Sequence, residues 1–369
     1  MSACLRADVI VVGLGPAGAC AAAAAARAGL RVIAVDRKKV AGLPVQCAEF
    51  VPGPLHAHIA NLAASTRQAI NSMTTMIEMG DLHHTPDFRG AIIDRARFDQ
   101  TLVADARDAG VHVIFDARVM SIDAEGIRLC DGTVIDGGIV IGCDGPRSLV
   151  GKAIGEVNHE LVETRQITVP LRKRQDATDI FLSGDYRGGY AWLFPRGDVA
   201  NLGLGVVPSD RHRLKSLLLE LHARLVNEDR VGSEVLSLTG GAIPVGGMLH
   251  PIGMKNGRSV LLAGDAAGLT NPVTGAGIAA AVLSGQMAGE AAAALYRGDQ
   301  GATETYVEEL REMFGISLAR AVLRRRDLLR AYANSEPPSR QAMRQGWIAF
   351  PEYWSQLADD TLLEERRPA

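Results

Sequence analysis

The sequence predicts an α/β fold in which a parallel-sheet domain is interrupted by an antiparallel β-sheet and followed by C-terminal helices. Short apolar strand patterns at 8–13, 138–142 and 259–265 each end in a glycine-containing turn. From about 160 to 250 the pattern changes to period-two strands broken by glycine and proline, with one helical stretch near 210–228. We therefore expect the parallel sheet to be assembled from discontinuous pieces around a β-rich insert.

The first βαβ unit comes from the N-terminal 36 residues. Residues 8–13 form a β-branched strand pattern, residues 16–28 are almost entirely alanine, and residues 31–36 form a second apolar run. Between the first strand and the helix stands Gly13-x-Gly15-x-x-Gly18. This order of elements predicts a Rossmann-like nucleotide-binding domain.

Each residue of this motif has a physical role at a pyrophosphate. Gly13 allows the tight turn, Gly15 admits the phosphates, and Gly18 lets the helix pack close to the sheet. The helix N-terminus, with Pro16 and Ala17, offers free N–H groups. Asp36 ends the second strand, followed by Arg37, where a carboxylate accepts hydrogen bonds from ribose hydroxyls. We expect FAD or NAD, rather than NADP, at this position.

The remaining elements follow in order. We expect a helix at 95–109, strands at 111–115, 118–123, 126–130, 133–136 and 138–142, a helix of small residues at about 275–297, and a charged helical tail at 302–333. The end, 334–369, contains prolines and polar residues, and we expect it to be partly disordered.

Composition and charge exclude several classes of protein. Hydrophobic residues make up 47% and charged residues 22%, as in globular proteins, and the net charge of -3 gives no basis for nucleic-acid binding. No uninterrupted apolar run predicts a transmembrane helix, and the N-terminus lacks the pattern of a signal peptide. The five cysteines are scattered without a CxxC pair, so a reduced, cytoplasmic compartment is expected. The adjacent His83 and His84 lack ligand spacing, so no metal site is expected.

Three further segments resemble the flavoprotein hydroxylase superfamily and favour FAD over NAD. They are Ile93-Asp94-Arg95-x-x-Phe98-Asp99-x-x-Leu102, Gly142-Cys143-Asp144-Gly145-x-x-Ser148, and Ala263-Gly264-Asp265-Ala266-Ala267-Gly268 continuing to Asn271-Pro272-x-x-Gly275-x-Gly277. A carboxylate at a strand end can hold ribityl hydroxyls, and a glycine-rich helix start can approach the flavin with bare N–H groups. The resemblance implies cofactor contacts from Arg95, Asp144, Gly145, Gly264, Asp265, Pro272, Gly275 and Gly277.

Within that superfamily the chain resembles the geranylgeranyl reductase family. The resemblance is carried by Gly189-Tyr190-Ala191-Trp192-Leu193-Phe194-Pro195, by Asn201-Leu202-Gly203-Leu204-Gly205, and by Pro44-Val45-Gln46-Cys47. It implies an FAD domain with a small antiparallel sheet over the flavin, and hydrogenation of isoprenoid double bonds by reduced FAD. We expect an FAD domain of 1–48, 91–158 and 257–300, a substrate domain of 49–90 and 159–256, and a helical tail of 301–369.

The predicted substrate site has two interpretations. Tyr190, Trp192 and Phe194 share one face of a strand, and Gly203 and Gly205 share a face of the next. The rings either border a flat apolar slot or simply cover the glycines as core packing. Cys47 is either a buried structural thiol or a residue facing the substrate beside the flavin. The other cysteines (Cys4, Cys20, Cys130 and Cys143) are expected to be structural.

Three functions stay open from the sequence. The first is a reductase of C=C bonds in an isoprenoid or other apolar substrate; with one GxGxxG motif, NAD(P)H docks transiently or another carrier, such as an electron-donor protein, delivers electrons. The second is a monooxygenase of an aromatic substrate, a hydroxylase before a halogenase, because Tyr190 and Phe194 depart from the halogenase motif. The third is a non-catalytic flavin- or lipid-binding protein.

A cluster of arginines in the tail has two interpretations as well. The cluster consists of Arg320, Arg324, Arg325, Arg326 and Arg330. We expect a solvated basic face on the helix; the alternative is peripheral contact with an anionic membrane that carries a lipid substrate.

Overall fold

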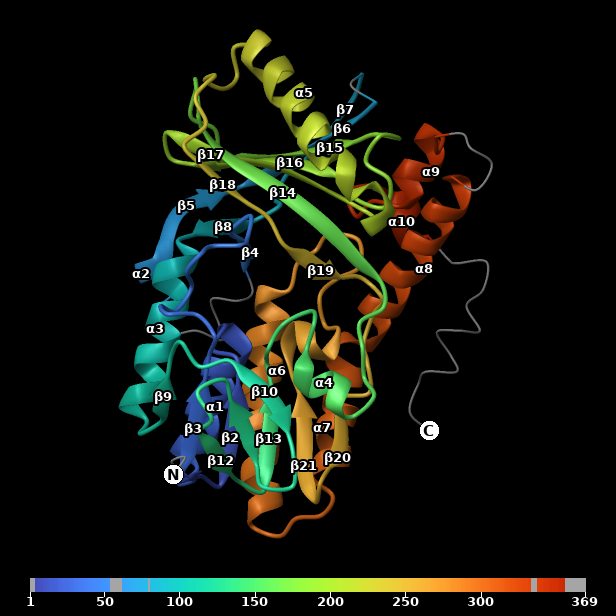
Figure 1. Ribbon diagram of the computed structural model, residues 1–369. Coiled ribbons are helices and arrows are strands. Elements are labelled where there is room, and N and C mark those ends of the chain that lie inside the picture. The colour runs from blue at the N-terminus through green and yellow to red at the C-terminus, as the bar shows by residue number, and fades with distance from the viewer. Residues whose placement is uncertain (1–3, 54–61, 79, 333–336, 356–369) are drawn as a thin grey trace.

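The computed structural model describes residues 4–53, 62–78, 80–332 and 337–355. Figure 1 shows two halves stacked on each other. The lower half contains a parallel sheet with α1 and α6, the upper half contains a large sheet with α5 on its outer face, and α8, α9 and α10 run along one side. We call these the cofactor half and the substrate half.

The cofactor half is built on a six-stranded sheet. Its spatial order is β20 (Ile252–Lys255), β21 (Arg258–Leu262), β13 (Ile139–Gly142), β2 (Val9–Val12), β3 (Val32–Val35) and β9 (His112–Ile114). All neighbours pair in parallel except β20, which is antiparallel to β21. Chain order reverses direction between β2 and β13, and nucleotides bind at such a switch point, outside the carboxyl ends of the strands.

Small residues set the packing of the helices on this sheet. α1 (Pro16–Arg27) lies against α6 (Ile278–Tyr296), and α3 (Arg95–Asp108) packs beside α1. A Cβ on Gly285 would stand 2.2 Å from the Ala17 carbonyl oxygen, and one on Gly289 would stand 2.4 Å from that of Ala21. The two helix backbones are therefore in direct contact. α6 is long and apolar enough to cross a membrane, but these contacts make it a core helix.

A smaller four-stranded sheet flanks the parallel sheet. The predicted meander forms β10 (Val119–Ile122), β11 (Ile127–Leu129) and β12 (Val134–Asp136), and β1 (Cys4–Arg6) adds in parallel to β12. It is followed, after β13, by the short helix α4 (Leu149–Ala153).

The substrate half is a large mixed sheet rather than the purely antiparallel one expected. The order is β18 (Ser237–Thr239), β14 (Leu161–Pro170), β17 (Val199–Val206), β16 (Ala191–Arg196), β15 (Ala177–Leu182), β6 (Ser72–Ile77) and β7 (Asp81–Thr85), with β19 (Ala242–Pro244) also pairing with β14. β6 pairs with β15 in parallel because the chain returns to this sheet after a long excursion through the cofactor half.

Two further elements complete this half. A 3-10 turn (Pro208–Arg213) leads into α5 (Leu214–Asn227), which buries leucines on the outer sheet face, so the predicted helix near 210–228 begins later than expected. A three-stranded sheet of β4 (Phe50–Pro52), β8 (Gly90–Ile93) and β5 (Thr66–Ile70), with the short helix α2 (Leu62–Ser65), joins the two halves.

The C-terminal part begins against the cofactor half, where α7 packs on α6, and ends against the substrate half. α7 (Ala302–Leu310), a π-helical turn (Arg311–Gly315) and α8 (Ile316–Ala331) are followed by α9 (Arg340–Gln345) and α10 (Pro351–Trp354). The expectation of disorder is wrong for 337–355, because Met343, Trp347 and Phe350 are buried in a core cluster with residues of the large sheet. The other residues of 334–369 lie outside the described part of the chain.

The expected solvated face on α8 is also wrong for two of its five arginines. Arg324 and Arg325 are only 7% and 6% exposed. Arg324 donates to the carbonyls of Glu352, Tyr353 and Ser355, and Arg325 donates to the Gly188 carbonyl. Burial lowers the pKa of Arg325 to about 10. These two side chains connect α8 to α10 and to the turn that precedes β16.

Candidate active site

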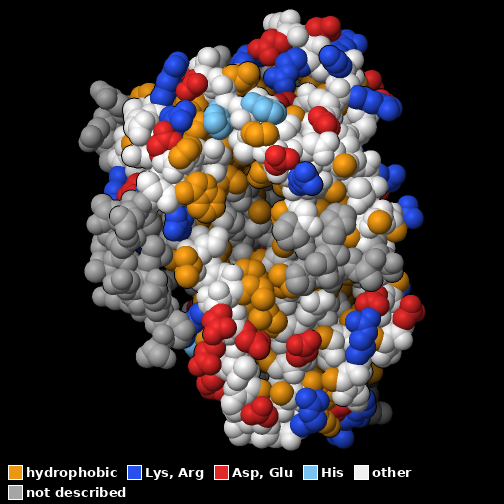
Figure 2. Space-filling view, turned by 180° about the vertical axis from the view of Figure 1, so that it is seen from behind, with side chains coloured by type: hydrophobic (Ala, Val, Ile, Leu, Met, Phe, Trp, Pro, Cys, Tyr) orange, Lys and Arg blue, Asp and Glu red, His pale blue; other side chains and the backbone are white. Residues whose placement is uncertain are grey.

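A cleft of about 650 Å³ lies between the two halves. Figure 2 shows the molecule hollowed there, with hydrophobic side chains around the opening. The cleft is lined by most of the residues predicted to form the site: Gly15, Pro16, Ala17, Arg37, Cys47, Arg95, Asp144, Gly145, Tyr190, Trp192, Phe194, Asp265, Gly275 and Gly277. Segments separated by more than 200 residues in sequence therefore meet around one cavity.

Four predicted cofactor residues lie behind the cleft wall rather than on it: Gly13, Gly18, Gly264 and Pro272. Gly13 has a φ of 95°, and a Cβ there would stand 2.3 Å from the Cys143 carbonyl oxygen. A Cβ on Gly18 would stand 1.7 Å from the Gly13 carbonyl oxygen. These two glycines therefore shape the turn through backbone contacts and let β13 and α1 approach it.

Asp36 also lies outside the cleft lining. Its carboxylate accepts from the backbone N–H of Leu14 and of Lys38, both at 2.7 Å, and the residue is 9% exposed. In this arrangement Asp36 holds the glycine turn against the end of β3. Its contact with a ribose remains a prediction.

The wall formed by α1 fits a pyrophosphate. The N-terminus of α1 has no side-chain cap, so the backbone N–H groups of its first turn are not satisfied by a side chain. Gly15, the N-cap residue, has nothing within 4 Å of a hypothetical Cβ, so space stands open where phosphate oxygens would approach. Gly15, Pro16 and Ala17 all border the cleft.

Two partly buried carboxyl groups in the cleft fit the hydroxyl groups of a flavin side chain. Asp144 accepts from the Ser148 hydroxyl and from the Leu149 N–H at 2.6 Å, and Asp265 accepts from Thr270 Oγ1 at 2.6 Å. Burial raises the pKa of both, more than their hydrogen bonds lower it. Hydroxyl donors from a ligand would stabilise the ionised forms.

Cys47 lies in the cleft on the segment that follows the first βαβ unit. Its Sγ accepts the N–H of Glu49 at 3.2 Å. Arg95 lies beside it; burial lowers the pKa of this guanidinium, but the ion pair with Asp99 and the Cys47 sulfur raise it further than burial lowers it. Cys47 is therefore an accessible thiol next to a permanent positive charge.

Glu49 is a site residue that sequence reasoning missed. Its carboxylate, 2% exposed, accepts from the Arg95 N–H at 3.0 Å, from Arg196 Nη1 at 2.8 Å and from Asn201 Nδ2 at 2.9 Å. It thereby ties the Cys47 segment to α3, β16 and β17. No motif surrounds Glu49 in the sequence, so only its long-range partners reveal it.

Gln166 is the second residue that sequence reasoning missed. The Trp192 indole N–H donates to Gln166 Oε1 at 3.0 Å, and Gln166 Nε2 donates to the Cys47 carbonyl at 3.1 Å. The side chain therefore couples the predicted aromatic face to the Cys47 segment. The sequence offers little signal for it, because Gln166 stands between Arg165 and Ile167 in an ordinary period-two strand pattern.

Both interpretations of the aromatic face hold in part. A Cβ on Gly203 would stand 2.4 Å from Trp192 Cζ2, so this ring covers the glycine as packing. The same ring also borders the cleft, together with Tyr190 and Phe194. Phe50, Phe88 and Trp347 line the same region, and we call these six rings the aromatic cluster. Its surface is a broad apolar wall rather than a closed slot.

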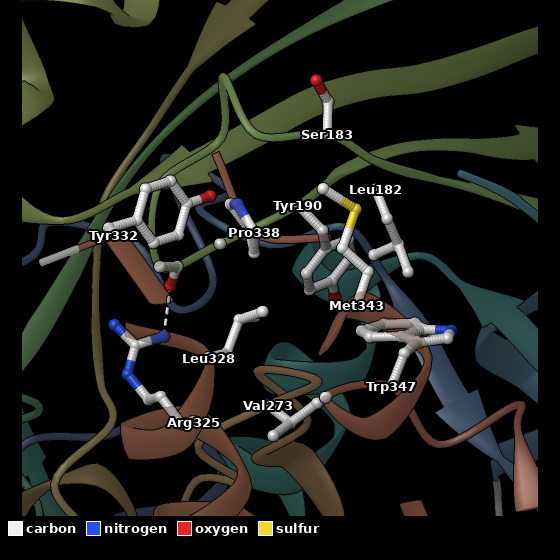
Figure 3. Close-up of a pocket in the computed structure, with 13 residues that line it drawn as sticks. Leu182, Ser183, Tyr190, Val273, Arg325, Leu328, Tyr332, Pro338, Met343 and Trp347 are labelled. Atoms are coloured by element: carbon white, nitrogen blue, oxygen red, sulfur yellow. Dashed lines mark hydrogen bonds between the residues drawn. The ribbon is translucent and has the colours of Figure 1, made fainter. Parts of the chain in front are cut away.

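A second, smaller cavity of about 40 Å³ adjoins the aromatic cluster. Figure 3 shows Tyr190 and Trp347 at one side of it and Leu328, Val273 and Met343 around it. Tyr190 and Trp347 line both cavities, with ring centroids 4.7 Å apart. The Tyr190 hydroxyl donates to the Thr274 carbonyl at 2.5 Å, which anchors this ring to the glycine-rich loop of the cofactor half.

The remaining cysteines and histidines have simpler surroundings. Cys143 lines the cleft next to Asp144 in sequence, and burial raises the pKa of its thiol well above the usual range. His83 packs its ring on Phe350 at a centroid distance of 4.7 Å. Within the described ranges, no group of three or more His, Cys, Asp or Glu side chains is placed to hold a metal ion.

Comparisons with known proteins place this site in a family. A model of FAD dependent oxidoreductases matches residues 8–144, and a model of the geranylgeranyl reductase catalytic domain matches residues 162–243. Digeranylgeranylglycerophospholipid reductase 2 of Methanopyrus kandleri is 34% identical over 336 residues, which cover 84% of this chain and 83% of that protein. The chain belongs to the geranylgeranyl reductase family of FAD-dependent oxidoreductases. The digeranylgeranylglycerophospholipid reductase of Methanothrix thermoacetophila is 32% identical over 86% of both chains.

Solved structures show that members of the geranylgeranyl reductase family share their fold with other flavoproteins. A geranylgeranyl bacteriochlorophyll reductase-like protein from Thermoplasma acidophilum aligns with a TM-score of 0.79 at 22% identity, covering 99% of this chain and 100% of that one. A flavin-dependent brominase aligns with a TM-score of 0.71 at 16% identity, covering 97% and 92%. At these identities the likeness extends to the fold alone.

Proposed function

We propose that this enzyme hydrogenates C=C bonds of an isoprenoid substrate. The aromatic cluster carries the proposal, because it gives the cofactor cleft an apolar wall suited to a polyprenyl chain. The match of 162–243 to the geranylgeranyl reductase catalytic domain, which contains Trp192, Gly203 and Gln166, supports it. So do the names of the relatives, which are reductases of geranylgeranyl lipids.

Each half of the chain has a distinct task in this reaction. Hydride transfer to the alkene is the chemistry that reduced FAD supplies when bound. The α1 N-terminus, Asp144 and Asp265 would hold the cofactor, and Arg95 would keep a positive charge beside the cleft. Tyr190, Trp192 and Phe194 would align the alkene and exclude water from the reacting carbon.

Cys47 is the group we assign to the substrate side of the reaction. Its Sγ lies in the cleft and is held by the Glu49 N–H, while Gln166 fixes its carbonyl. The thiol would place the alkene and deliver the proton that the neighbouring carbon needs. The electron donor would be NAD(P)H docking transiently or a carrier protein.

Anaerobic turnover tests the reaction. The FAD-loaded protein is reduced with dithionite without oxygen and mixed with a C20 prenyl alcohol, while flavin absorbance and product mass are followed. We expect flavin reoxidation and a product that has gained two hydrogen atoms per turnover. Reoxidation that needs oxygen and yields a hydroxylated aromatic product would establish the monooxygenase instead, and reduced flavin that no candidate reoxidises would leave a binding protein.

A pair of cysteine variants tests the role of Cys47. Cys47→Ala should slow alkene reduction by at least about tenfold, within the range typical of a lost proton donor, and Cys47→Ser should restore part of it. Cys143→Ala is the matched control, since this thiol also lines the cleft but follows β13 in the cofactor half. Full turnover by Cys47→Ala would exclude the assigned role.

A further inference from the structure

A groove of about 690 Å³ opens beside the cofactor cleft, at the edge of the substrate sheet. We call it the basic groove. In contrast to the aromatic cluster, its lining is polar and basic. The charged side chains are Arg147, Arg165, Arg211, Lys215 and Glu163, and His212 stands among them. Four cations therefore face one carboxylate in a protein whose net charge is -3.

Most of this positive charge is uncompensated. Arg147 pairs with Glu163 at 2.5 Å. Arg165, Arg211 and Lys215 have no carboxylate within ion-pair distance among the residues that the structure describes. Like charges gathered around a concave surface raise the local concentration of anions, because their potentials add inside the groove.

The groove is continuous with the active-site cleft. Arg147, Thr164, Thr239 and Gly240 line both. Thr239 Oγ1 donates to the Val45 carbonyl at 2.7 Å, and Gln46 Nε2 donates to the Gly240 carbonyl at 2.8 Å. The wall between the groove and the cleft is thus bonded to the same segment that carries Cys47.

We propose that this groove binds the phosphate or diphosphate headgroup of the isoprenoid substrate. The inference rests on the proposed function, because an amphiphile with an apolar chain at the aromatic cluster needs a site for its anionic end. Guanidinium groups bind phosphate oxygens bidentately, and the Lys215 ammonium adds a point charge. The headgroup stays in contact with water in this open groove, while the chain enters the cleft across the wall of Thr164 and Gly240.

A binding measurement tests the site without any turnover. Inorganic diphosphate is titrated calorimetrically into the FAD-loaded protein, the triple variant Arg165→Ala/Arg211→Ala/Lys215→Ala, and the control Lys173→Ala/Arg297→Ala/Arg311→Ala. The control removes the same charge from exposed arginines and lysines elsewhere. We expect binding to the wild type and to the control, and its loss in the triple variant. Absence of binding to the wild type would overturn the proposal.

Kinetics identify the source of the phosphate. A C20 prenyl diphosphate, a diprenyl glycerophosphate in micelles and the C20 prenyl alcohol are compared as substrates. The triple variant should lose about 100-fold in kcat/KM on the phosphorylated substrate that the groove serves, and nothing on the alcohol. An equal loss on the alcohol, or a raised KM for NAD(P)H alone, would overturn the headgroup assignment. Diphosphate binding without turnover of any isoprenoid would reject the proposed function and the headgroup as the source, while the phosphate site would stand.

Discussion

The two halves of the cleft are built in opposite ways. In the cofactor half, Gly15 borders the cleft with backbone alone, and Gly13 and Gly18 shape the turn that carries it at the end of a strand. In the substrate half, Trp192, Gln166 and Glu49 form the cleft wall with side chains whose partners stand more than 25 residues away. The cofactor half depends on positions that carry no side chain, and the substrate half depends on hydrogen bonds between particular side chains.

The sharpest test of the cofactor half is Gly18→Ala compared with Gly15→Ala. A methyl group at 18 would meet the Gly13 carbonyl oxygen at 1.7 Å, whereas one at 15 meets nothing within 4 Å. We expect Gly18→Ala to destabilise the protein by at least about 3 kcal/mol and to abolish FAD retention. Gly15→Ala should fold normally yet bind FAD more weakly, because its methyl group occupies space open to the phosphates. Thermal unfolding and the flavin content of the purified proteins measure both effects; equal stability of the two variants would contradict this account.

In the substrate half the largest effect is expected at Glu49. Glu49→Ala leaves Arg196 and the Asn201 amide without their buried partner. We expect a loss of about 2–3 kcal/mol in the free energy of unfolding. This loss is smaller than for a fully buried ion pair, because the Arg196 side chain is 33% exposed. Asp198→Ala is the matched control: it removes an ion pair with Arg174 in which both side chains are 74% exposed, so it should change the free energy of unfolding much less than Glu49→Ala does. If chemical denaturation gives similar losses of unfolding free energy for the two variants, the buried hydrogen bonds of Glu49 do not have the stabilising role assigned to them.

This contrast explains what the sequence could and could not predict. The cofactor residues were identified because each stands at a strand end in a local motif, as Asp144 does after β13 and Asp265 after β21. The aromatic face was visible as a period-two pattern. Glu49 and Trp347 were not identified, because a buried carboxylate and a tryptophan in a polar tail acquire their roles only through residues far along the chain. The same reason misassigned Arg324 and Arg325, whose carbonyl partners carry no sequence signal.

The two tryptophans of the aromatic cluster allow a smaller, more selective test. The indole N–H of Trp192 donates to Gln166, whereas that of Trp347 is buried without a partner among the described residues. Trp192→Phe should cost about 2 kcal/mol, because it also leaves Gln166 Oε1 unpaired, and it should slow alkene reduction through the displaced Cys47 segment. Trp347→Phe removes an unsatisfied donor along with some apolar area, so it should cost less. Urea unfolding compares the stability of the two variants. A greater loss of stability for Trp347→Phe would mean that buried apolar area contributes more than indole hydrogen bonding in this cluster.

The smallest expected effect is in the cofactor half, and it changes sign with the ligand. Burial raises the pKa of Asp265 above its ordinary value of 3.8, so the folded apoprotein favours the protonated carboxyl. The corresponding stability is fully present below pH 3.8 and is lost as the pH rises through the folded pKa. Asp265→Asn should therefore raise the melting temperature of the apoprotein at neutral pH, and this gain should vanish at acidic pH. With FAD bound, the same variant should weaken cofactor affinity by about tenfold, because a ribityl hydroxyl donates more strongly to a carboxylate than to an amide. A melting temperature that does not respond to pH in this way would mean that the carboxylate is already stabilised without the cofactor, by Thr270 and the charge of Arg95.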